Sequence, residues 1–318
     1  MNWFSIFLGA VMGLVLFIYA ITLLSNSLKA SSQDKVKSIL TRFTNNRFSG
    51  VLTGTGATII IGSSSVTTVT VIALVNAGLL SFASSLGVVM GSNIGTTFTS
   101  QLFAFDLGKY APVIVLIGFV ASFLKQESIS KTGKILFALG LIFFSLDHIS
   151  QSVAPLKGYQ PFLNFLETFQ NPWLGVLAGA LFTFSVQSSS ATMGTVIALS
   201  MQGLMTLPAA TVIMLGAEIG TCGSSLIASI GRSQTAIRTG LFHLLFNVST
   251  VLIGVFFIDE LIATATWISG NASLERKIAN AHAIFNIGGM LLFIGFTPYI
   301  AGQLGKLNFK NLASIVNR

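Results

Sequence analysis

Charged residues are scarce in this chain of 318 residues: Asp, Glu, Lys and Arg make up 8% of it, against 53% hydrophobic residues. Because soluble domains carry about 25% charged residues, the composition excludes an ordinary soluble protein. A stretch of about 20 mostly apolar residues spans a bilayer. Trp3 to Leu24, Gly240 to Ile258 and Ala279 to Ile300 are such stretches. The sequence therefore predicts an integral membrane protein in contact with the lipid bilayer.

Cysteine is also nearly absent, since Cys222 is the only one. This excludes a disulfide framework and a cysteine-based metal site, and we expect no cofactor. The formal net charge of +8 could indicate nucleic-acid binding, but the basic residues lie between apolar segments, where they set membrane topology. We therefore expect no nucleic-acid partner. The first apolar stretch has no basic start and no small-residue cleavage site, which favours a transmembrane helix over a signal peptide.

The chain contains an internal repeat. Gly54 to Gln101 aligns without a gap with Gly179 to Leu226, and more than a third of the aligned pairs are identical. Each copy has three consecutive serines, Ser63 to Ser65 and Ser188 to Ser190, in the middle of an apolar run. Interrupted apolar segments at corresponding positions of two halves are typical of a transporter binding site.

Each serine-rich unit is predicted to form a re-entrant helical hairpin, because irregular backbone at membrane depth must be buried in protein or line a wet cavity. The predicted fold class is all-α: a polytopic membrane protein with two inverted repeats, each with a re-entrant hairpin, and about six further spanning helices. The basic residues favour this topology slightly. A single crossing by each unit distributes the charges almost as well. The N-terminus would lie outside and the C-terminus in the cytoplasm.

The repeat divides the chain into four parts. Residues 1–48 would form the first transmembrane helix and a cytoplasmic amphipathic segment, and 49–152 the first repeat. Residues 153–171 would be an interfacial linker, and 172–318 the second repeat. Each repeat would hold one hairpin and three helices. Two stretches that mix polar and apolar residues, Lys35 to Phe48 and Pro161 to Phe169, are predicted to lie at the membrane surface.

A hairpin tip brings helix ends together. Half-helix N-termini present unpaired amides that suit an oxyanion, and carbonyls at half-helix C-termini suit a small cation such as sodium. Neither tip contains lysine or arginine, so an anion held there would need accompanying cations. Both serine triplets are followed two positions later by a threonine, Thr67 or Thr192. This duplication favours a binding site over close packing of small residues.

Three motifs carry a resemblance to a known family. The second tip reads Gln187-Ser188-Ser189-Ser190, Gly91 to Thr97 reads GSNIGTT, and two segments of the type H-x-x-F-N begin at His243 and His282. On these motifs the chain resembles the type II sodium-phosphate cotransporter family, whose mark is a duplicated QSSS motif. The resemblance covers nearly the whole chain. It implies a bacterial member in the inner (plasma) membrane, which we expect to lack the family's soluble C-terminal domain.

The resemblance implies sodium-coupled uptake of inorganic phosphate by alternating access, and no enzymatic activity. Phosphate would be shared between the two hairpins, and sodium would be the only metal ion. The implied phosphate-binding residues are Ser63, Ser64, Ser65, Gln187, Ser188, Ser189 and Ser190. The implied cation-binding residues are Thr67, Asn93, Thr96, Gln187, Thr192, Glu218 and Thr221.

Two positions depart from the family pattern. Gly62 stands where the family has Gln, and Glu218 stands at the repeat position of Asn93. An ionisable group in an apolar run is a functional hypothesis by default, so Glu218 would contact a coupling cation or take up a proton. The alternative for this carboxylate is a structural pair with Arg232.

Other functions remain open at this point. The cargo could be another small anion, and Glu218 could couple transport to protons. A membrane serine hydrolase is a remote alternative, because serine needs an activating base and an oxyanion hole. His243 and His282 are the only plausible bases, and neither lies in a Gly-x-Ser-x-Gly context. For both histidines we expect packing and interhelical hydrogen bonds, and not a metal site.

Overall fold

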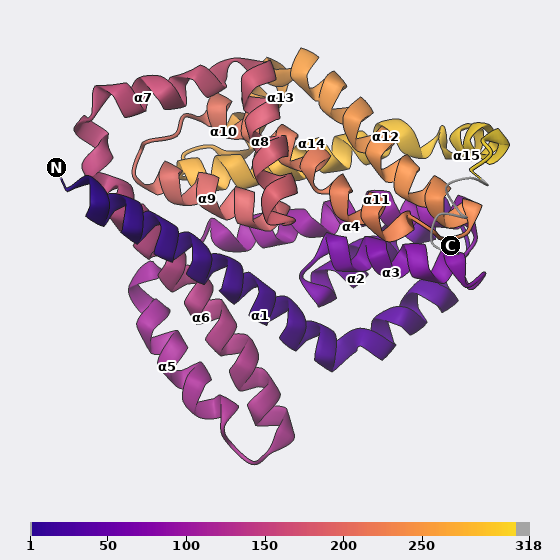
Figure 1. Ribbon diagram of the computed structural model, residues 1–318, viewed down its shortest axis with the longest axis horizontal. Coiled ribbons are helices and arrows are strands. Elements are labelled where there is room, and N and C mark those ends of the chain that lie inside the picture. Colours follow the sequence, from indigo (N-terminus) through magenta and orange to yellow (C-terminus); the bar gives the residue numbers. More distant parts are fainter. Residues whose placement is uncertain (1, 310–318) are drawn as a thin grey trace.

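The computed structural model describes residues Asn2 to Phe309 and contains helices but no strand within that range (Figure 1). The first half comprises α1 (Trp3–Phe43), α2 (Arg47–Ile61), α3 (Ser64–Asn76), α4 (Phe82–Phe103), η1 (Gly108–Tyr110), α5 (Ala111–Ser122), α6 (Glu127–Val153) and η2 (Ala154–Gly158). The second half comprises α7 (Gln160–Glu167), η3 (Thr168–Gln170), α8 (Pro172–Val186), α9 (Ser189–Met201), α10 (Leu207–Gly220), α11 (Cys222–Ser229), α12 (Gln234–Phe256), α13 (Ile258–Ser269), α14 (Leu274–Ile294) and α15 (Thr297–Lys306).

Five helical segments are long and apolar enough to cross a membrane: α1, α6, α10 with α11, α12 and α14. The helices α4 and α5, bent by 74° where they meet, make a sixth if they count as one span. The prediction of an all-α polytopic membrane protein is confirmed. This bent pair follows the first hairpin and precedes α6.

Each serine-rich unit folds as two short helices that meet at a break. The limbs have 15 and 13 residues in the first unit, α2 and α3, and again in the second, α8 and α9. At 1.5 Å per residue these limbs are about 20–23 Å long. The hydrocarbon core is about 30 Å thick, so a single limb is too short to cross it. The two breaks fall at the predicted tips.

Glycines set the packing of both hairpins in the same way. The first limb of each hairpin lies against the helix that follows the hairpin, α2 on α4 and α8 on α10. A Cβ atom at Gly54 would collide with the carbonyl oxygen of Val88, and one at Gly179 with that of Ile213. Both pairs are equivalent under the repeat. The repeated glycines therefore preserve one backbone contact in two places.

Helix α1 runs along one side of the molecule and packs on α2 and α6 (Figure 1). It is continuous to Phe43, so most of the amphipathic stretch expected from Lys35 to Phe48 is the end of this helix and not a separate helix, and the rest leads into α2. The reason is local, because no glycine or proline lies between Gly13 and Gly50. The second stretch expected at the surface forms the short helix α7 with η3.

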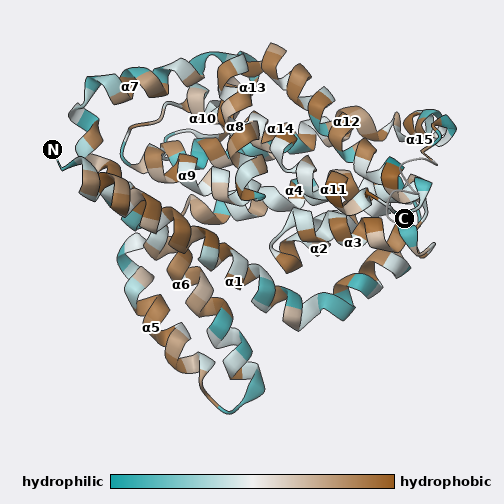
Figure 2. Ribbon diagram, in the orientation of Figure 1, coloured by the Kyte–Doolittle hydropathy of each residue, from teal (hydrophilic) through white to brown (hydrophobic). Residues whose placement is uncertain are grey.

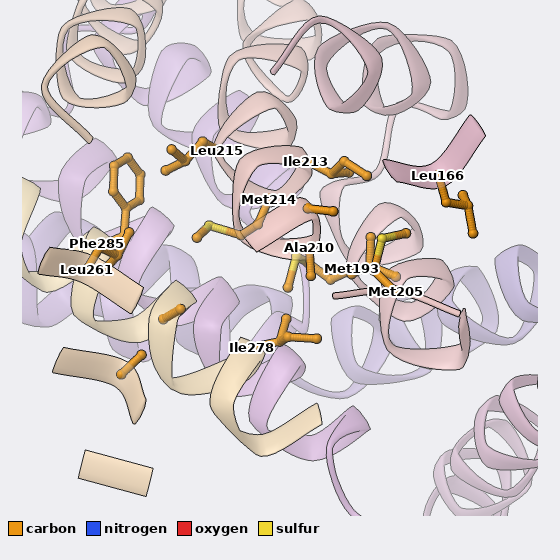
Figure 3. Close-up of a cluster of buried hydrophobic side chains, with 14 of the residues drawn as sticks. Leu166, Met193, Met205, Ala210, Ile213, Met214, Leu215, Leu261, Ile278 and Phe285 are labelled. Carbon is orange, nitrogen blue, oxygen red and sulfur yellow. The ribbon is translucent and has the colours of Figure 1, made fainter. Parts of the chain in front are cut away.

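The outer surface and the core are both apolar, as a bilayer requires. Figure 2 shows hydrophobic residues along α5, α6 and the first half of α1, and hydrophilic ones along its second half. Inside, Met193 of α9, Met214 of α10 and Phe285 of α14 belong to one buried cluster (Figure 3). This cluster joins the second hairpin to α10 and α14.

Candidate functional site

The tips of the two hairpins meet at one cavity of about 250 Å³. Gly62 to Val66 line it from the first hairpin, and Val186 to Ser190 line it from the second. All of the residues predicted to bind phosphate are among them. The structure therefore brings together two segments that are far apart in the sequence and equivalent under the repeat.

The two tips have the same capping geometry. Ser63 is the N-cap of α3 and Ser188 is the N-cap of α9, and their hydroxyl oxygens accept from the amides of Val66 at 3.3 Å and Ala191 at 3.2 Å. The first amides of a helix have no intrahelical acceptor, and each cap satisfies only one of them. The helix end also carries partial positive charge. Each tip thus offers free amides and hydroxyls to an anion.

The residue before each cap has a left-handed backbone, with φ of 71° at Gly62 and 57° at Gln187. Gln187 is the only residue other than glycine with positive φ in the described part of the chain. This conformation costs a residue with a Cβ atom roughly 1–2 kcal/mol. Gly62 therefore keeps the shape of the tip and removes the side-chain amide. The side-chain amide of Gln187 donates to the Phe184 carbonyl at 2.5 Å.

Helix α1 closes the cavity with polar residues that the sequence analysis missed. Thr22, Ser25 and Asn26 line it beside Ile18 and Ile21. Their spacing could have revealed them, because residues three and four apart lie on one helical face and polar ones stand out in an apolar helix. No charged residue is among the lining residues.

A second polar cluster, outside the lining of this cavity, surrounds Glu218 on α10. Its side chain is 5% exposed. Its Oε1 accepts from Nε2 of His282 at 2.7 Å and from Nδ2 of Asn286 at 3.0 Å, both on α14. The suggested pair with Arg232 is wrong, since that guanidinium donates to the Ala228 carbonyl at 2.6 Å. The carboxylate is instead hydrogen-bonded by a histidine and an asparagine from a distant helix.

Asn93 occupies the equivalent position on α4 and is also buried. Its Nδ2 donates to Oδ1 of Asn247 on α12 at 2.7 Å. The expectation of interhelical hydrogen bonds for the histidines is confirmed by His282 and by His243, whose Nδ1 lies 2.8 Å from the Ser225 hydroxyl. Among the described residues, no group of three or more His, Cys, Asp or Glu converges as a metal ion would need.

The other predicted cation ligands lie within the hairpins and beside them. The Thr67 hydroxyl accepts from Thr58 on the facing limb at 3.0 Å, and Thr192 pairs with Thr183 at 2.5 Å. All four are buried. Of the predicted cation ligands, Gln187 alone lines the cavity. The remaining candidates, Thr96 and Thr221, are buried on α4 and at the end of α10.

The family follows from a comparison with protein-family models. A model described as Na+/Pi-cotransporter matches residues 16–151 and 158–297. The chain belongs to this family. Both hairpins, α4 and the helices that carry the two histidines lie within the matched residues, so the resemblance seen in the motifs is confirmed. The chain is a multi-pass membrane protein of a phosphate transporter family.

Individual relatives agree with this assignment. The uncharacterized protein YqeW of Bacillus subtilis is 28% identical over 287 residues, which cover 89% of this chain and 92% of YqeW. The putative inorganic phosphate export protein YjbB of Escherichia coli is 28% identical over 274 residues, 84% of this chain and 49% of YjbB. The chain thus spans about half of that relative. Human sodium-dependent phosphate transport protein 2B is 32% identical over 132 residues, 38% of this chain and 19% of that protein. No solved structure matches the chain.

Proposed function

We propose that the protein is a secondary transporter that couples sodium to the uptake of inorganic phosphate, and that phosphate binds between the two hairpin tips. One observation carries the proposal: two serine-rich tips from equivalent halves line a single cavity. Such a site at the interface of two repeats is the general plan of secondary transporters.

The chemistry of the cavity suits an oxyanion that arrives with cations. Ser64 and Ser189 begin α3 and α9, so amides and the positive ends of two helix dipoles meet there. Hydroxyls can donate to phosphate oxygens. The Gln187 side chain can donate to phosphate through its NH2 group or coordinate a cation through its carbonyl oxygen. Without lysine or arginine in the lining, the charge of phosphate must be balanced by ions that bind with it. This is the physical reason for coupling.

The coupling cations are proposed to bind at Gln187 and along the hairpins and their neighbouring helices. Thr67 and Thr192 provide hydroxyl oxygens inside the hairpins, and Asn93 and Glu218 provide amide and carboxylate oxygens on α4 and α10. Thr96 and Thr221 follow these two positions by one helical turn. Oxygen ligands of this kind suit a hard cation.

Alternating access would follow from inverted repeats in the plasma (inner) membrane. The hairpins would re-enter from opposite faces, with the N-terminus outside and the C-terminus in the cytoplasm. Short limbs with a polar break support re-entry. The direction of net transport depends on the ion gradients. The relatives are named for different directions or drives, because YjbB is named as an export protein and human protein 2B as sodium-dependent.

A hydrolase is disfavoured by the same geometry. An activated serine needs a base within hydrogen-bond reach. No histidine or carboxylate is among the residues that line the cavity. His243 and His282 are instead bonded to Ser225 and Ser100, whose hydroxyls are buried and do not line the cavity.

The test is uptake of labelled phosphate into proteoliposomes with and without an inward sodium gradient. We expect uptake to require the gradient and, at low phosphate, to fall about threefold to tenfold in Gln187→Ala and Ser188→Ala. Ser185→Ala is the matched control, because this nearby hydroxyl is exposed and bonds to the Leu181 carbonyl of its own helix. Equal uptake with and without sodium would contradict the coupling. Sulfate and arsenate in the same assay test the cargo, and a pH gradient without sodium tests proton coupling.

A further inference from the structure

Two helices carry a histidine followed by an asparagine one turn later: His243 and Asn247 on α12, and His282 and Asn286 on α14. Residues four apart lie on one helical face. All four side chains are at most 3% exposed. Both helices pack on α4 of the first repeat and on α10 of the second. Each histidine–asparagine pair therefore lies on a helix that contacts both α4 and α10, the helices that follow the two hairpins.

The histidines contact one serine from each repeat. Nδ1 of His282 lies 2.8 Å from the Ser100 hydroxyl on α4, and Nδ1 of His243 lies 2.8 Å from the Ser225 hydroxyl on α11. Ser100 and Ser225 are equivalent under the repeat. The two histidines therefore contact equivalent serines in opposite repeats through the same ring nitrogen.

The asparagines contact the other repeat in each case. Asn247, whose histidine is bonded to the second repeat, accepts from Asn93 of the first at 2.7 Å. Asn286, whose histidine is bonded to the first repeat, donates to Glu218 of the second at 3.0 Å. His282 donates to the same carboxylate oxygen at 2.7 Å. Each asparagine thus bonds to a residue of the repeat that does not contain its histidine's serine partner.

The protons of one pair can be assigned from its hydrogen-bond network. The Ser225 hydroxyl donates to the Cys222 carbonyl at 2.8 Å, so it accepts from Nδ1–H of His243. Nε2 of His243 is then an acceptor and lies 3.3 Å from Nδ2 of Asn247. That nitrogen also donates to the Glu218 carbonyl at 2.6 Å. Each donor in this chain of contacts therefore meets an acceptor, as a buried network requires.

We propose that His243–Asn247 and His282–Asn286 are positioning pairs for the coupling-ion sites. Each holds the ion-site residue of one repeat, Asn93 or Glu218, against a helix that is anchored to a serine of the other repeat. The proposal rests on the proposed function, in which these two residues bind cations. Its consequence is that loss of the Ser100 hydroxyl, in the first repeat, weakens the ion site at Glu218, in the second.

The first test measures the sodium concentration that gives half-maximal phosphate uptake. In Ser100→Ala we expect it to rise about threefold to tenfold, the factor that one net hydrogen bond gives, with the maximal rate unchanged. Ser100→Thr keeps the hydroxyl and should restore the wild-type value. Ser145→Ala is the matched control, because Ser145 is equally buried but bonds only to the Ile142 carbonyl of α6. Equal shifts in Ser100→Ala and Ser145→Ala would overturn the proposal.

The second test needs no transport. Cys222 is fully buried and its Sγ lies 3.2 Å from Nδ2 of Asn247, so its labelling by N-ethylmaleimide reports on the first pair. We expect at least fivefold faster labelling in Asn247→Ala and Ser225→Ala than in the wild type, and no change in Ser145→Ala. Cys222→Ala gives the background. Unchanged labelling in both network variants would overturn the proposed geometry, whether or not the wild type requires sodium.

The two tests separate the proposals. If uptake by the wild type does not depend on sodium, the proposed coupling is wrong. Labelling of Cys222 then still tests whether the histidine–asparagine pairs hold the repeats together. A sodium-dependent wild type whose half-saturation is unchanged in Ser100→Ala and in Ser225→Ala removes the positioning role alone. Two serines in different repeats keep the first test decisive if one variant does not fold.

Discussion

The first repeat reaches its tip through Gly62 and the second through Gln187, yet both residues take the same left-handed backbone. Two residues after the GSNIGTT-type segment begins, the repeats differ again, with Asn93 in the first and Glu218 in the second. The caps, the glycine contacts and the threonine pairs are meanwhile matched. The comparison teaches that backbone geometry is preserved between the halves, while the buried carboxylate of Glu218 and the side-chain amide at the tip are found in the second half and not at the matching positions of the first.

The largest difference between the halves should appear when the two matched buried positions are truncated. Glu218→Ala leaves His282 and Asn286 without their shared acceptor and should lower the free energy of unfolding by on the order of 3 kcal/mol. Asn93→Ala leaves only the Asn247 carbonyl oxygen without its donor and should cost about 1 kcal/mol. Thermal unfolding of the purified variants in one detergent measures both.

Glu218→Gln is the control for that experiment, because it keeps an acceptor oxygen and removes the charge. It should retain most of the stability lost in Glu218→Ala and still lose uptake if the carboxylate binds a coupling ion. Equal destabilisation by Glu218→Ala and Asn93→Ala would show that the charge adds nothing to the second repeat.

The caps should show the opposite, an equal effect in the two halves. Ser63→Ala and Ser188→Ala each remove an N-cap hydroxyl, which costs about 1 kcal/mol of stability. Because both hydroxyls line the cavity, each variant should also raise the phosphate concentration for half-maximal uptake, by about threefold to tenfold. Unfolding and uptake kinetics measure the two effects. A change in phosphate affinity from one tip alone would contradict a shared site.

Much of the fold could be predicted because the signals are local. The repeat, the apolar lengths and the glycine or glutamine at each break are all visible in the sequence, and they place the hairpin limbs correctly. The continuity of α1 through Lys35 was missed, although the lack of glycine and proline up to Gly50 is also a local signal. The mixed polar and apolar residues after Lys35 favour a separate segment at the membrane surface, and they do not end the helix.

The candidate site was predictable only in part, because its partners come from remote segments. That both tips share a cavity follows from duplication, but Asn26 of α1 lies in it through tertiary packing alone. The pairing of Glu218 with His282 joins residues 64 positions apart. Arg232 is nearer to Glu218 in sequence, which is why the sequence suggests it as a partner. The H-x-x-F-N segment that contains His282 does not indicate which carboxylate this histidine will contact.

The smallest expected change in stability belongs to the tip residue itself, and it tests why the two tips differ. In Gln187→Gly, relief of the left-handed strain is largely offset by the greater freedom of glycine in the unfolded chain, so the free energy of unfolding should change by less than about 1 kcal/mol. Uptake should nevertheless fall, since the amide is lost from the cavity. Gly62→Gln is the reciprocal variant, and its Cβ would lie 3.2 Å from Cδ1 of Leu28, the end of a flexible side chain, with the same left-handed strain as Gln187. If Gln187→Gly transports normally, the strain at this tip serves no binding role; if Gly62→Gln changes the sodium dependence, the missing amide is what sets the two halves apart.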